Sequence, residues 1–404
     1  MYDVIVVGAR VAGAPTAMLL ARKGYRVLLV DQATFPSDTI STHHIQRAGL
    51  ATAQRWGLLS RLIATGGPQI RSVTFDLGPF ALSGNPLPID GIDFDLCPRR
   101  TLLDTTLVEA AAEAGVEVRE GFSVERVLTD GNQVVGISGR DSTRGQMVQE
   151  YARIVVGADG RHSRIARLVN APTYNTRAAV TFGYYSYWSD VELEGLEIYP
   201  REGCAVVAEP TNDGLIYVAI GWRHDQFEMV RAELDVHFRR TLQACAPRLA
   251  ERVRGGQRVA AYKGAEFPFY FRRPYGDGWA LVGDAGYHRD AATGQGITDA
   301  FRGADLLATA VDAGFSGRQS LTSALVDYEQ RRNAAVMPMY EFTYKLARLE
   351  APTPEEQRLF GALRENQYEA ERFLSTIAGS VSIPEFFAES NVARILRSAL
   401  PTAA

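Results

Sequence analysis

A glycine-rich turn near the start of the chain has the spacing of a dinucleotide-binding motif. Gly8 and Gly13 occupy the first and third glycine positions, Arg10 replaces the middle glycine, and Asp31 follows 18 residues after Gly13. The first glycine permits a tight turn, the next helix presents free N–H groups to a pyrophosphate, and the acidic residue accepts hydrogen bonds from a ribose diol. The predicted cofactor-binding residues of this segment are Gly8, Ala12, Gly13, Asp31 and Gln32.

The elements around this turn form a βαβ pattern. Residues 2–7 are a β-branched run typical of a buried strand, residues 14–23 are helical and end at Gly24, and residues 26–31 form a second apolar strand. This unit alone does not separate NAD from FAD, and an α/β crossover without a nucleotide is the alternative.

Two later segments also place an aspartate at a glycine turn after a strand. Asp159 lies in VVGADGRHS (residues 155–163) and Asp284 lies in ALVGDA (residues 280–285). Each carboxylate can accept a hydrogen bond from a ligand hydroxyl. The alternatives are an ordinary Asp-Gly turn for Asp159 and a helix-capping carboxylate for Asp284.

These three segments, in this order and at this spacing, resemble the FAD-dependent monooxygenases of the para-hydroxybenzoate hydroxylase type. The related geranylgeranyl-reductase-like flavoproteins share the scaffold, and the resemblance covers about residues 1–315. It implies an α/β fold: a glutathione-reductase-type FAD-binding Rossmann fold with an inserted antiparallel β-sheet substrate domain.

The resemblance also implies roles for individual residues. Asp284 would accept from a ribityl hydroxyl of FAD, and Gly296 and Ile297, at the start of a predicted helix, would lie beside the flavin pyrimidine edge. Asp159 would support FAD and a passing NAD(P)H, and Arg100 would contact an FAD phosphate, with a solvated helix-start arginine as the alternative. The sequence has no second glycine-rich βαβ unit, so NAD(P)H is expected as a transient co-substrate.

The chain departs from the family pattern at several positions. Tyr287 and Ala291 stand where a histidine and a proline are expected, and Ala166 replaces an expected arginine. The proline lies near the flavin face at which oxygen reacts in the family, so its loss argues against the standard hydroxylation geometry. No Trp-x-Trp-x-Ile-Pro element is present, which argues against a flavin-dependent halogenase.

Three residues are the candidates for catalysis. His43 is predicted to contact flavin or substrate, Asp290 to act as a base or substrate anchor, and Tyr184 to cover the substrate from an aromatic strand. The alternatives are a helix-start histidine, a surface salt pair, and a strand buried in the core or at a dimer contact. His43 and His44 have no carboxylate or cysteine nearby at metal-ligand spacing, so no metal site is expected.

The coarse pattern predicts FAD-binding parts, a substrate domain and a helical end. The FAD-binding parts are residues 1–70, 99–172 and 276–320, the substrate domain is residues 71–98 and 173–275, and the helical segment is residues 321–404. Three β-rich runs within residues 178–222 predict an antiparallel sheet. One long helix, broken only near Pro247, is expected over residues 226–254, and further helix breaks are expected at Pro338, Pro352 and Pro384.

The composition of the chain limits the kinds of partner that it is expected to bind. The 404 residues carry a formal net charge of −4, which offers no bulk attraction to nucleic acid, and no apolar run is long enough to span a membrane. The N-terminus does not resemble a signal peptide, and the three cysteines are too few for a disulfide framework, so a cytoplasmic protein is expected. Either a monomer or a homodimer is compatible with the sequence.

These observations favour an enzyme that uses FAD, NAD(P)H and O2 to hydroxylate or epoxidise an aromatic or polycyclic small molecule, as in bacterial specialised metabolism. One alternative is an FAD-dependent reductase or dehydrogenase that acts on C=C bonds without oxygen insertion. Another is a flavin-binding protein with a non-redox role that binds or cyclises a ligand.

Overall fold

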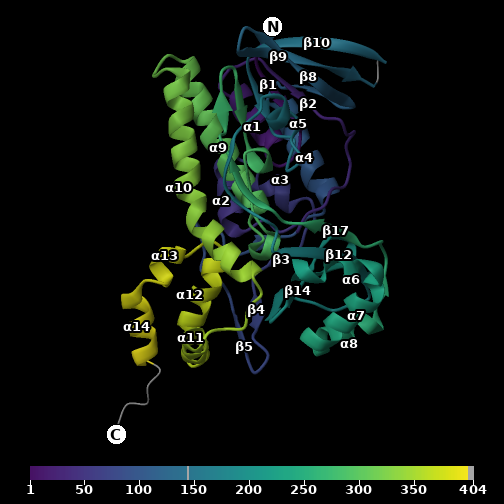
Figure 1. Ribbon diagram of the computed structural model, residues 1–404, viewed down its shortest axis with the longest axis vertical. Helices are drawn as coiled ribbons and strands as arrows, with labels where there is room; N and C mark the ends of the chain where they lie inside the picture. The colour runs from purple at the N-terminus through teal and green to yellow at the C-terminus, as the bar shows by residue number, and fades with distance from the viewer. Residues whose placement is uncertain (143–144, 399–404) are drawn as a thin grey trace.

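Two lobes, each built on its own sheet, make up the protein in the computed structural model, which describes residues 1–142 and 145–398. In Figure 1 the N-terminal strands form the upper lobe and a second sheet forms the lower one. The long helix α10 (Leu321–Ala347) runs along one side from the upper lobe to the lower. This architecture confirms the predicted α/β fold class, with an antiparallel sheet inserted into an FAD-type fold.

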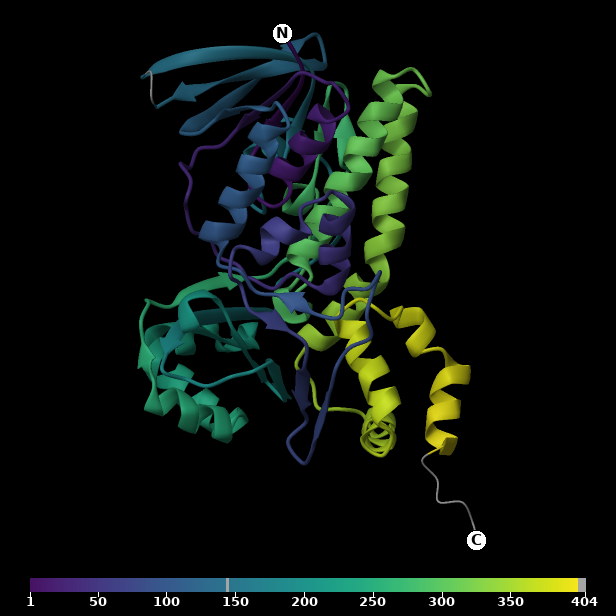
Figure 2. The same cartoon turned by 180° about the vertical axis from the view of Figure 1, so that it is seen from behind.

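The upper sheet has a parallel centre of apolar strands that are buried on both faces, as is usual where helices cover a parallel sheet. In spatial order its strands are β19 (Tyr275–Gly276), β20 (Trp279–Leu281), β10 (Gln146–Gly157), β1 (Tyr2–Val7), β2 (Val27–Val30) and β7 (Glu117–Arg119). β8 (Phe122–Asp130) and β9 (Gln133–Asp141) pair antiparallel with each other, and β9 with β10, as a ribbon that projects from this lobe (Figure 2).

Helices from several parts of the chain pack together against this sheet, and their apolar residues form the largest core cluster. They are α1 (Gly13–Ala21), α2 (Arg47–Arg55), α3 (Leu59–Ile63), α4 (Arg100–Glu113) and α9 (Gly296–Phe315). α1 lies against both α4 and α9, so the first and third glycine segments meet at one edge of the sheet.

The lower sheet is mostly antiparallel. Its order is β16 (Gln257–Arg258), β12 (Thr181–Ser189), β15 (Ile216–Arg223), β14 (Cys204–Pro210), β13 (Leu196–Arg201), β4 (Val73–Asp76) and β5 (Ala81–Gly84), with β17 (Lys263–Glu266) also paired to β12. The predicted antiparallel pairing of the three β-rich runs is confirmed, whereas β13 joins β4 in parallel. One face is covered by α6 (Phe227–Ala232), α7 (Leu234–Cys245) and α8 (Pro247–Gly255).

Further short strands and helices lie outside the two large sheets. They are the sheet of β11 (Thr173–Arg177), β18 (Phe269–Arg272) and β21 (Tyr287–His288), the pair β3 (Gln69–Ile70) and β6 (Asp95–Leu96), α5 (Arg164–Leu168), and the helices α11 (Pro354–Arg364), α12 (Gln367–Ile377), α13 (Ile383–Phe386) and α14 (Glu389–Ser398). Within residues 1–142 and 145–398, no helix has the length and apolar character needed to cross a membrane.

Two helix predictions need correction. The predicted break near Pro247 is confirmed, because the backbone leaves the helical region at Ala246 and Pro247 starts α8. A second break at Glu233 was not predicted, so residues 226–254 form three helices. Pro338 lies inside α10, which continues through it. Val336 and Tyr340 beside it pack into an apolar cluster, and this packing offsets the backbone hydrogen bond that proline cannot donate.

Candidate active site

The first glycine turn leaves no room for side chains at two positions. Gly8 has φ +103°, and a Cβ on it would lie 2.5 Å from the carbonyl oxygen of Ala158. A Cβ on Gly13 would lie 1.7 Å from the carbonyl oxygen of Gly8. α1 therefore starts in direct backbone contact with the ends of β1 and β10, as a nucleotide-binding helix must.

Asp31 is fixed at the end of β2 by backbone amides. Its two carboxylate oxygens accept from the N–H groups of Ala9 (2.7 Å) and Ala33 (2.8 Å). Each oxygen keeps a lone pair with which it can accept from a ribose hydroxyl. Gln32, the next residue, is exposed. Ala12 is buried against Gly283, and a Cβ on Gly283 would lie only 2.7 Å from the Cβ of Ala12.

Arg10 turns away from the glycine turn into a cluster of charges. It pairs with Asp104 at 2.6 Å, and the buried Arg100 contacts the other oxygen of the same carboxylate at 3.0 Å. Arg10 also donates to the carbonyl oxygen of Asp38 (3.5 Å), whose carboxylate pairs with two more cations at 3.8 and 2.5 Å. We call this group the +2 cluster; its members are Arg10, Arg99, Arg100, Lys263, Asp38 and Asp104. Its net charge of +2 complements a pyrophosphate dianion.

Asp159 and Asp284 are placed differently. Asp159 accepts from the backbone N–H groups of Arg164 (2.6 Å) and Ile165 (3.1 Å), so it caps α5 while its role toward the cofactor stays a prediction. Asp284 is exposed in the turn after β20, and its carboxylate has no hydrogen-bond partner among the residues that the structure describes. It is therefore free to accept from a ligand hydroxyl.

The N-terminus of α9 faces open space. Gly294 adopts a left-handed conformation (φ +61°) before the helix, and a Cβ on Gly296 would meet no atom within 4 Å. Ile297 is buried in the core and anchors the first turn. The unpaired N–H groups and the positive dipole end of this 20-residue helix can stabilise negative charge on a ring edge placed there.

His43 lies in a cage of tyrosines and is not at a helix start. Its backbone is left-handed (φ +62°), its ring is fully buried, and its Nε2 lies 2.5 Å from the hydroxyl of Tyr187. The rings of Tyr185 and Tyr217 meet it edge-on. Burial and the nearby guanidinium of Arg100 lower the pKa of His43 to about 3, so the ring is neutral near pH 7.

His44 is held between two buried carboxylates. Its Nδ1 lies 2.6 Å from Glu209 and its Nε2 lies 3.5 Å from Asp95, which also pairs with the buried Arg47 at 3.1 Å. Burial opposes protonation of His44, but Glu209 and Asp95 raise its pKa to about 10. We call His44, Arg47, Asp95 and Glu209 the charge quartet; its two positive and two negative charges balance.

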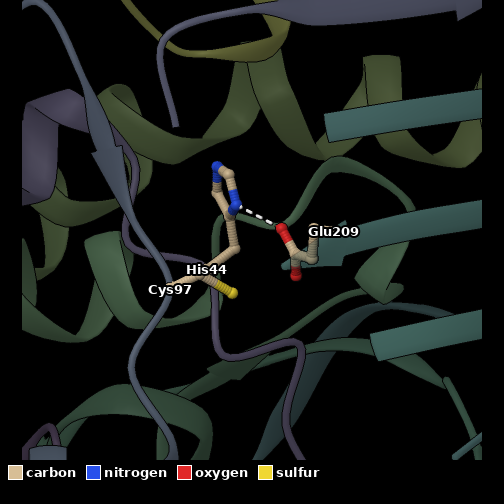
Figure 3. A group of neighbouring side chains, drawn as sticks. All are labelled: His44, Cys97 and Glu209. Atoms are coloured by element: carbon tan, nitrogen blue, oxygen red, sulfur yellow. Dashed lines mark hydrogen bonds and ion pairs between the residues drawn. The ribbon is translucent and has the colours of Figure 1, made fainter. Parts of the chain in front are cut away.

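Cys97 completes a group with His44 and Glu209, and the three residues offer ligand atoms within 4.8 Å of one another (Figure 3). The sequence argument that no carboxylate or cysteine lies near the histidines is therefore wrong, because the fold brings both from distant segments. The imidazolium already pairs with one oxygen of Glu209, and burial raises the pKa of the Cys97 thiol well above its ordinary value. A protonated thiol is a poor metal ligand, so we still expect no metal site here.

A largely apolar cavity of about 130 Å³ lies between the lower sheet and the loop from Asp290 to Gly294. Its walls include Leu196, Ile198, Val207, Tyr217, Ile220, Phe267, Leu349 and Ile377. The cavity thus joins the two lobes at the place where the start of α9 is open.

Asp290 is a buried carboxylate in the wall of this cavity. The hydroxyl of Thr181 and the backbone N–H of Ala292 (2.8 Å) donate to it. Burial raises the pKa of Asp290 to about 6 in spite of these two donors. A carboxyl group with this pKa can exchange a proton near neutral pH.

The aromatic strand β12 presents its two faces differently. Tyr185 and Tyr187 point toward His43, whereas Phe182 and Trp188 pack under the helices of the lower lobe. Tyr184 borders the cavity, but its ring lies 6.2 Å from that of Phe182, on the helix-covered side. The structure therefore brings His43 together with Tyr187, and a catalytic role for Tyr184 stays a prediction.

Sequence reasoning did not find Glu209, Tyr187 or the cations Arg99 and Lys263. Glu209 alone had a local signal, because it is a single acidic residue in the otherwise apolar run CAVVAEP. Tyr187, Arg99 and Lys263 could be assigned to the site only from the arrangement of the two lobes in the structure.

The fold and the site together define an FAD-dependent oxidoreductase. The chain belongs to the family described as "FAD binding domain", whose model matches residues 1–343. Members of this family use FAD with reduction by NAD(P)H, and the glycine turn, Asp31, the +2 cluster and the start of α9 fit that cofactor.

The chain is similar to proteins with different activities. It is 29% identical over 318 residues to digeranylgeranylglycerophospholipid reductase 2 of Methanopyrus kandleri, covering 73% of each chain. Its fold matches that of the flavin-dependent brominase Bmp2 (TM-score 0.82, 19% identity, 98% of each chain). It also matches PqsL, a probable FAD-dependent monooxygenase from Pseudomonas aeruginosa (TM-score 0.71, 21% identity, 93% of this chain and 99% of that one).

We predict that Asp284→Ala weakens FAD binding by tenfold or more, because a ligand hydroxyl loses an ionised acceptor worth about 1.5–3 kcal/mol. The measurement is a fluorescence titration of the deflavinated protein with FAD. Asp277→Ala, in the preceding β19–β20 turn, is the control and should bind FAD as the parent does. Unchanged affinity for the Asp284 variant would contradict the assignment of the third segment.

Proposed function

We propose that this protein is an NAD(P)H- and O2-using monooxygenase that hydroxylates or epoxidises a small aromatic or polycyclic molecule. The observation that carries the proposal is the apolar cavity that contains Asp290 and adjoins the open start of α9. FAD supplies the redox chemistry when bound. The side chains of this protein have three tasks: they hold the substrate, keep water away from it and accept its proton.

The cavity walls perform the first two tasks. Apolar side chains from β13, β14, β15, α10 and α12 exclude water, which favours oxygen transfer to substrate over side reactions. A cavity of about 130 Å³ is close to the ~150 Å³ that accommodates benzene in an engineered protein. The size therefore favours a substrate with a single ring, at the small end of the proposed range.

Asp290 performs the third task. As a carboxylate, it accepts the proton of a phenol or of a similar activated group, which makes the ring more electron-rich. Thr181 and Ala292 hold this carboxylate at a fixed position in the cavity wall.

The pH profile of turnover tests Asp290. Turnover should rise with pH through about 6, because the base form increases above its pKa. Asp290→Asn should lower turnover by about 100-fold and remove this rise. Thr181→Val is the matched variant: it deletes a donor that stabilises the carboxylate, so the rise should move to higher pH. A parental profile in both variants would rule out Asp290 as the base.

Labelled oxygen tests the reaction class. The purified holoenzyme is given NADPH, ¹⁸O2 and a panel of small aromatic compounds, and products are analysed by mass spectrometry. A monooxygenase incorporates one labelled atom into the product. Reduced product without label would instead support a reductase, and ligand binding without NAD(P)H oxidation would support a non-redox role.

Reduction of C=C bonds is the second candidate. The 29% identity to an archaeal prenyl-lipid reductase over 73% of both chains favours it. Halogenation has less support despite the shared fold with a brominase, because the Trp-x-Trp-x-Ile-Pro element is missing. We expect no brominated product when bromide is added to the labelled-oxygen assay.

A further inference from the structure

The described residues of the cavity wall include acids but no unpaired cation. Among the described residues that line it there is no lysine or arginine, and the ionisable acids are Glu209 and Asp290. Both are buried, with 2% and 6% of their surface exposed. His44 is the one basic side chain among the wall residues that the structure describes.

The charge of His44 is already neutralised. Both of its ring nitrogens are directed at carboxylates, with Nδ1 toward Glu209 (2.6 Å) and Nε2 toward Asp95 (3.5 Å). Since Arg47 balances the second carboxylate, the quartet offers a ligand no net positive charge.

Three cations outside this wall, Arg99, Lys263 and Arg289, have partners of their own. Arg99 and Lys263 pair with Asp38 in the +2 cluster, which belongs to the expected pyrophosphate site. Arg289 pairs with Asp299 at 2.7 Å. A carboxylate inside the cavity would therefore lose its water and find no unpaired cation among the described residues that line the wall. It would also lie beside the oxygens of Glu209 and Asp290, which as carboxylates accept hydrogen bonds and cannot donate one to it.

We propose, on the basis of the proposed function, that the cavity selects aromatic substrates that lack an acidic group and that present a hydrogen-bond donor, an amine or a hydroxyl, to Glu209. The carboxylate of Glu209 has about four acceptor positions, and His44 uses one oxygen. An amine or hydroxyl donor can take another, and the apolar walls cover the ring.

Three probes of nearly equal size test this selection: benzylamine, benzyl alcohol and benzoate. Each is titrated into the oxidised FAD holoenzyme at pH 7.5 without NAD(P)H, and binding is measured by calorimetry and by the flavin absorption change. We expect benzoate to bind at least 100-fold more weakly than benzyl alcohol, and benzylamine to bind at least as tightly as the alcohol.

Two variants test whether Glu209 and Asp290 cause this discrimination among the probes. Glu209→Gln should remove the advantage of benzylamine and improve benzoate binding at least tenfold, with parental FAD content and circular dichroism as evidence of folding. If that variant does not fold, Asp290→Asn should improve benzoate binding in the same direction. Glu266→Gln is the control, because this half-exposed acid lies on β17 outside the cavity wall, and it should keep the parental ranking.

Benzoate binding that equals or exceeds that of benzyl alcohol overturns the proposal, as does a lack of binding by all three probes. A ranking that does not change in the folded Glu209 and Asp290 variants also overturns it. Because these titrations involve no turnover, they are independent of the labelled-oxygen result, which alone decides whether the reaction is oxygenation.

Discussion

Replacement of Gly13 by alanine is expected to abolish FAD binding. The new Cβ would lie 1.7 Å from the carbonyl oxygen of Gly8, far inside van der Waals contact, and this oxygen is a backbone atom that no side-chain rotation can move away. α1 must then move away from β1, which withdraws its N–H groups from the pyrophosphate. The measurement is flavin absorbance of the purified protein after incubation with excess FAD.

Gly361→Ala is the matched control. Gly361 lies in α11, where an added Cβ would meet no atom within 4 Å. Since alanine favours a helix over glycine by about 1 kcal/mol, this variant should retain FAD and unfold at an equal or higher urea concentration. A Gly13→Ala protein with stoichiometric, tightly bound FAD would show that the turn is not the cofactor site.

Replacement of His44 by leucine is expected to lower the free energy of unfolding by about 3–5 kcal/mol. The change leaves Glu209 buried without its partner and leaves Asp95 with Arg47 alone. Urea unfolding at pH 7 measures the loss. The double variant His44→Leu with Glu209→Leu should lose less than the single variant, because no uncompensated buried charge remains.

The pH dependence of stability gives an independent check on the charge quartet. His44 has a folded pKa of about 10 against an ordinary value of 6.5. Its contribution to stability is therefore complete below pH 6.5 and declines as pH rises from 6.5 through about 10. The leucine variant should lack this alkaline decline. A single-variant cost below about 1 kcal/mol, or an unchanged alkaline profile, would contradict the assignment of a buried imidazolium.

The elements that depend on local residue pattern could be predicted from the amino-acid sequence. The strand, glycine turn and helix of residues 2–21 form from short-range preferences, and the glycines at positions 8 and 13 are required by contacts within the same motif. The alternation of Phe182 and Tyr185 across the two faces of β12 follows from the two-residue period of a strand. These local features predicted an α/β fold, and the resemblance of the three glycine–aspartate segments to a flavoprotein family then indicated FAD.

Which polar residues meet in the interior of the site depends on the folded arrangement of the two lobes. His44 and Glu209 are 165 residues apart and meet only because a loop of one lobe lies against the sheet of the other. Pro338 is helical because long-range packing outweighs its local cost. Which charges become buried together is set by contacts between distant segments, and such contacts leave no periodic pattern in the sequence from which they could be predicted.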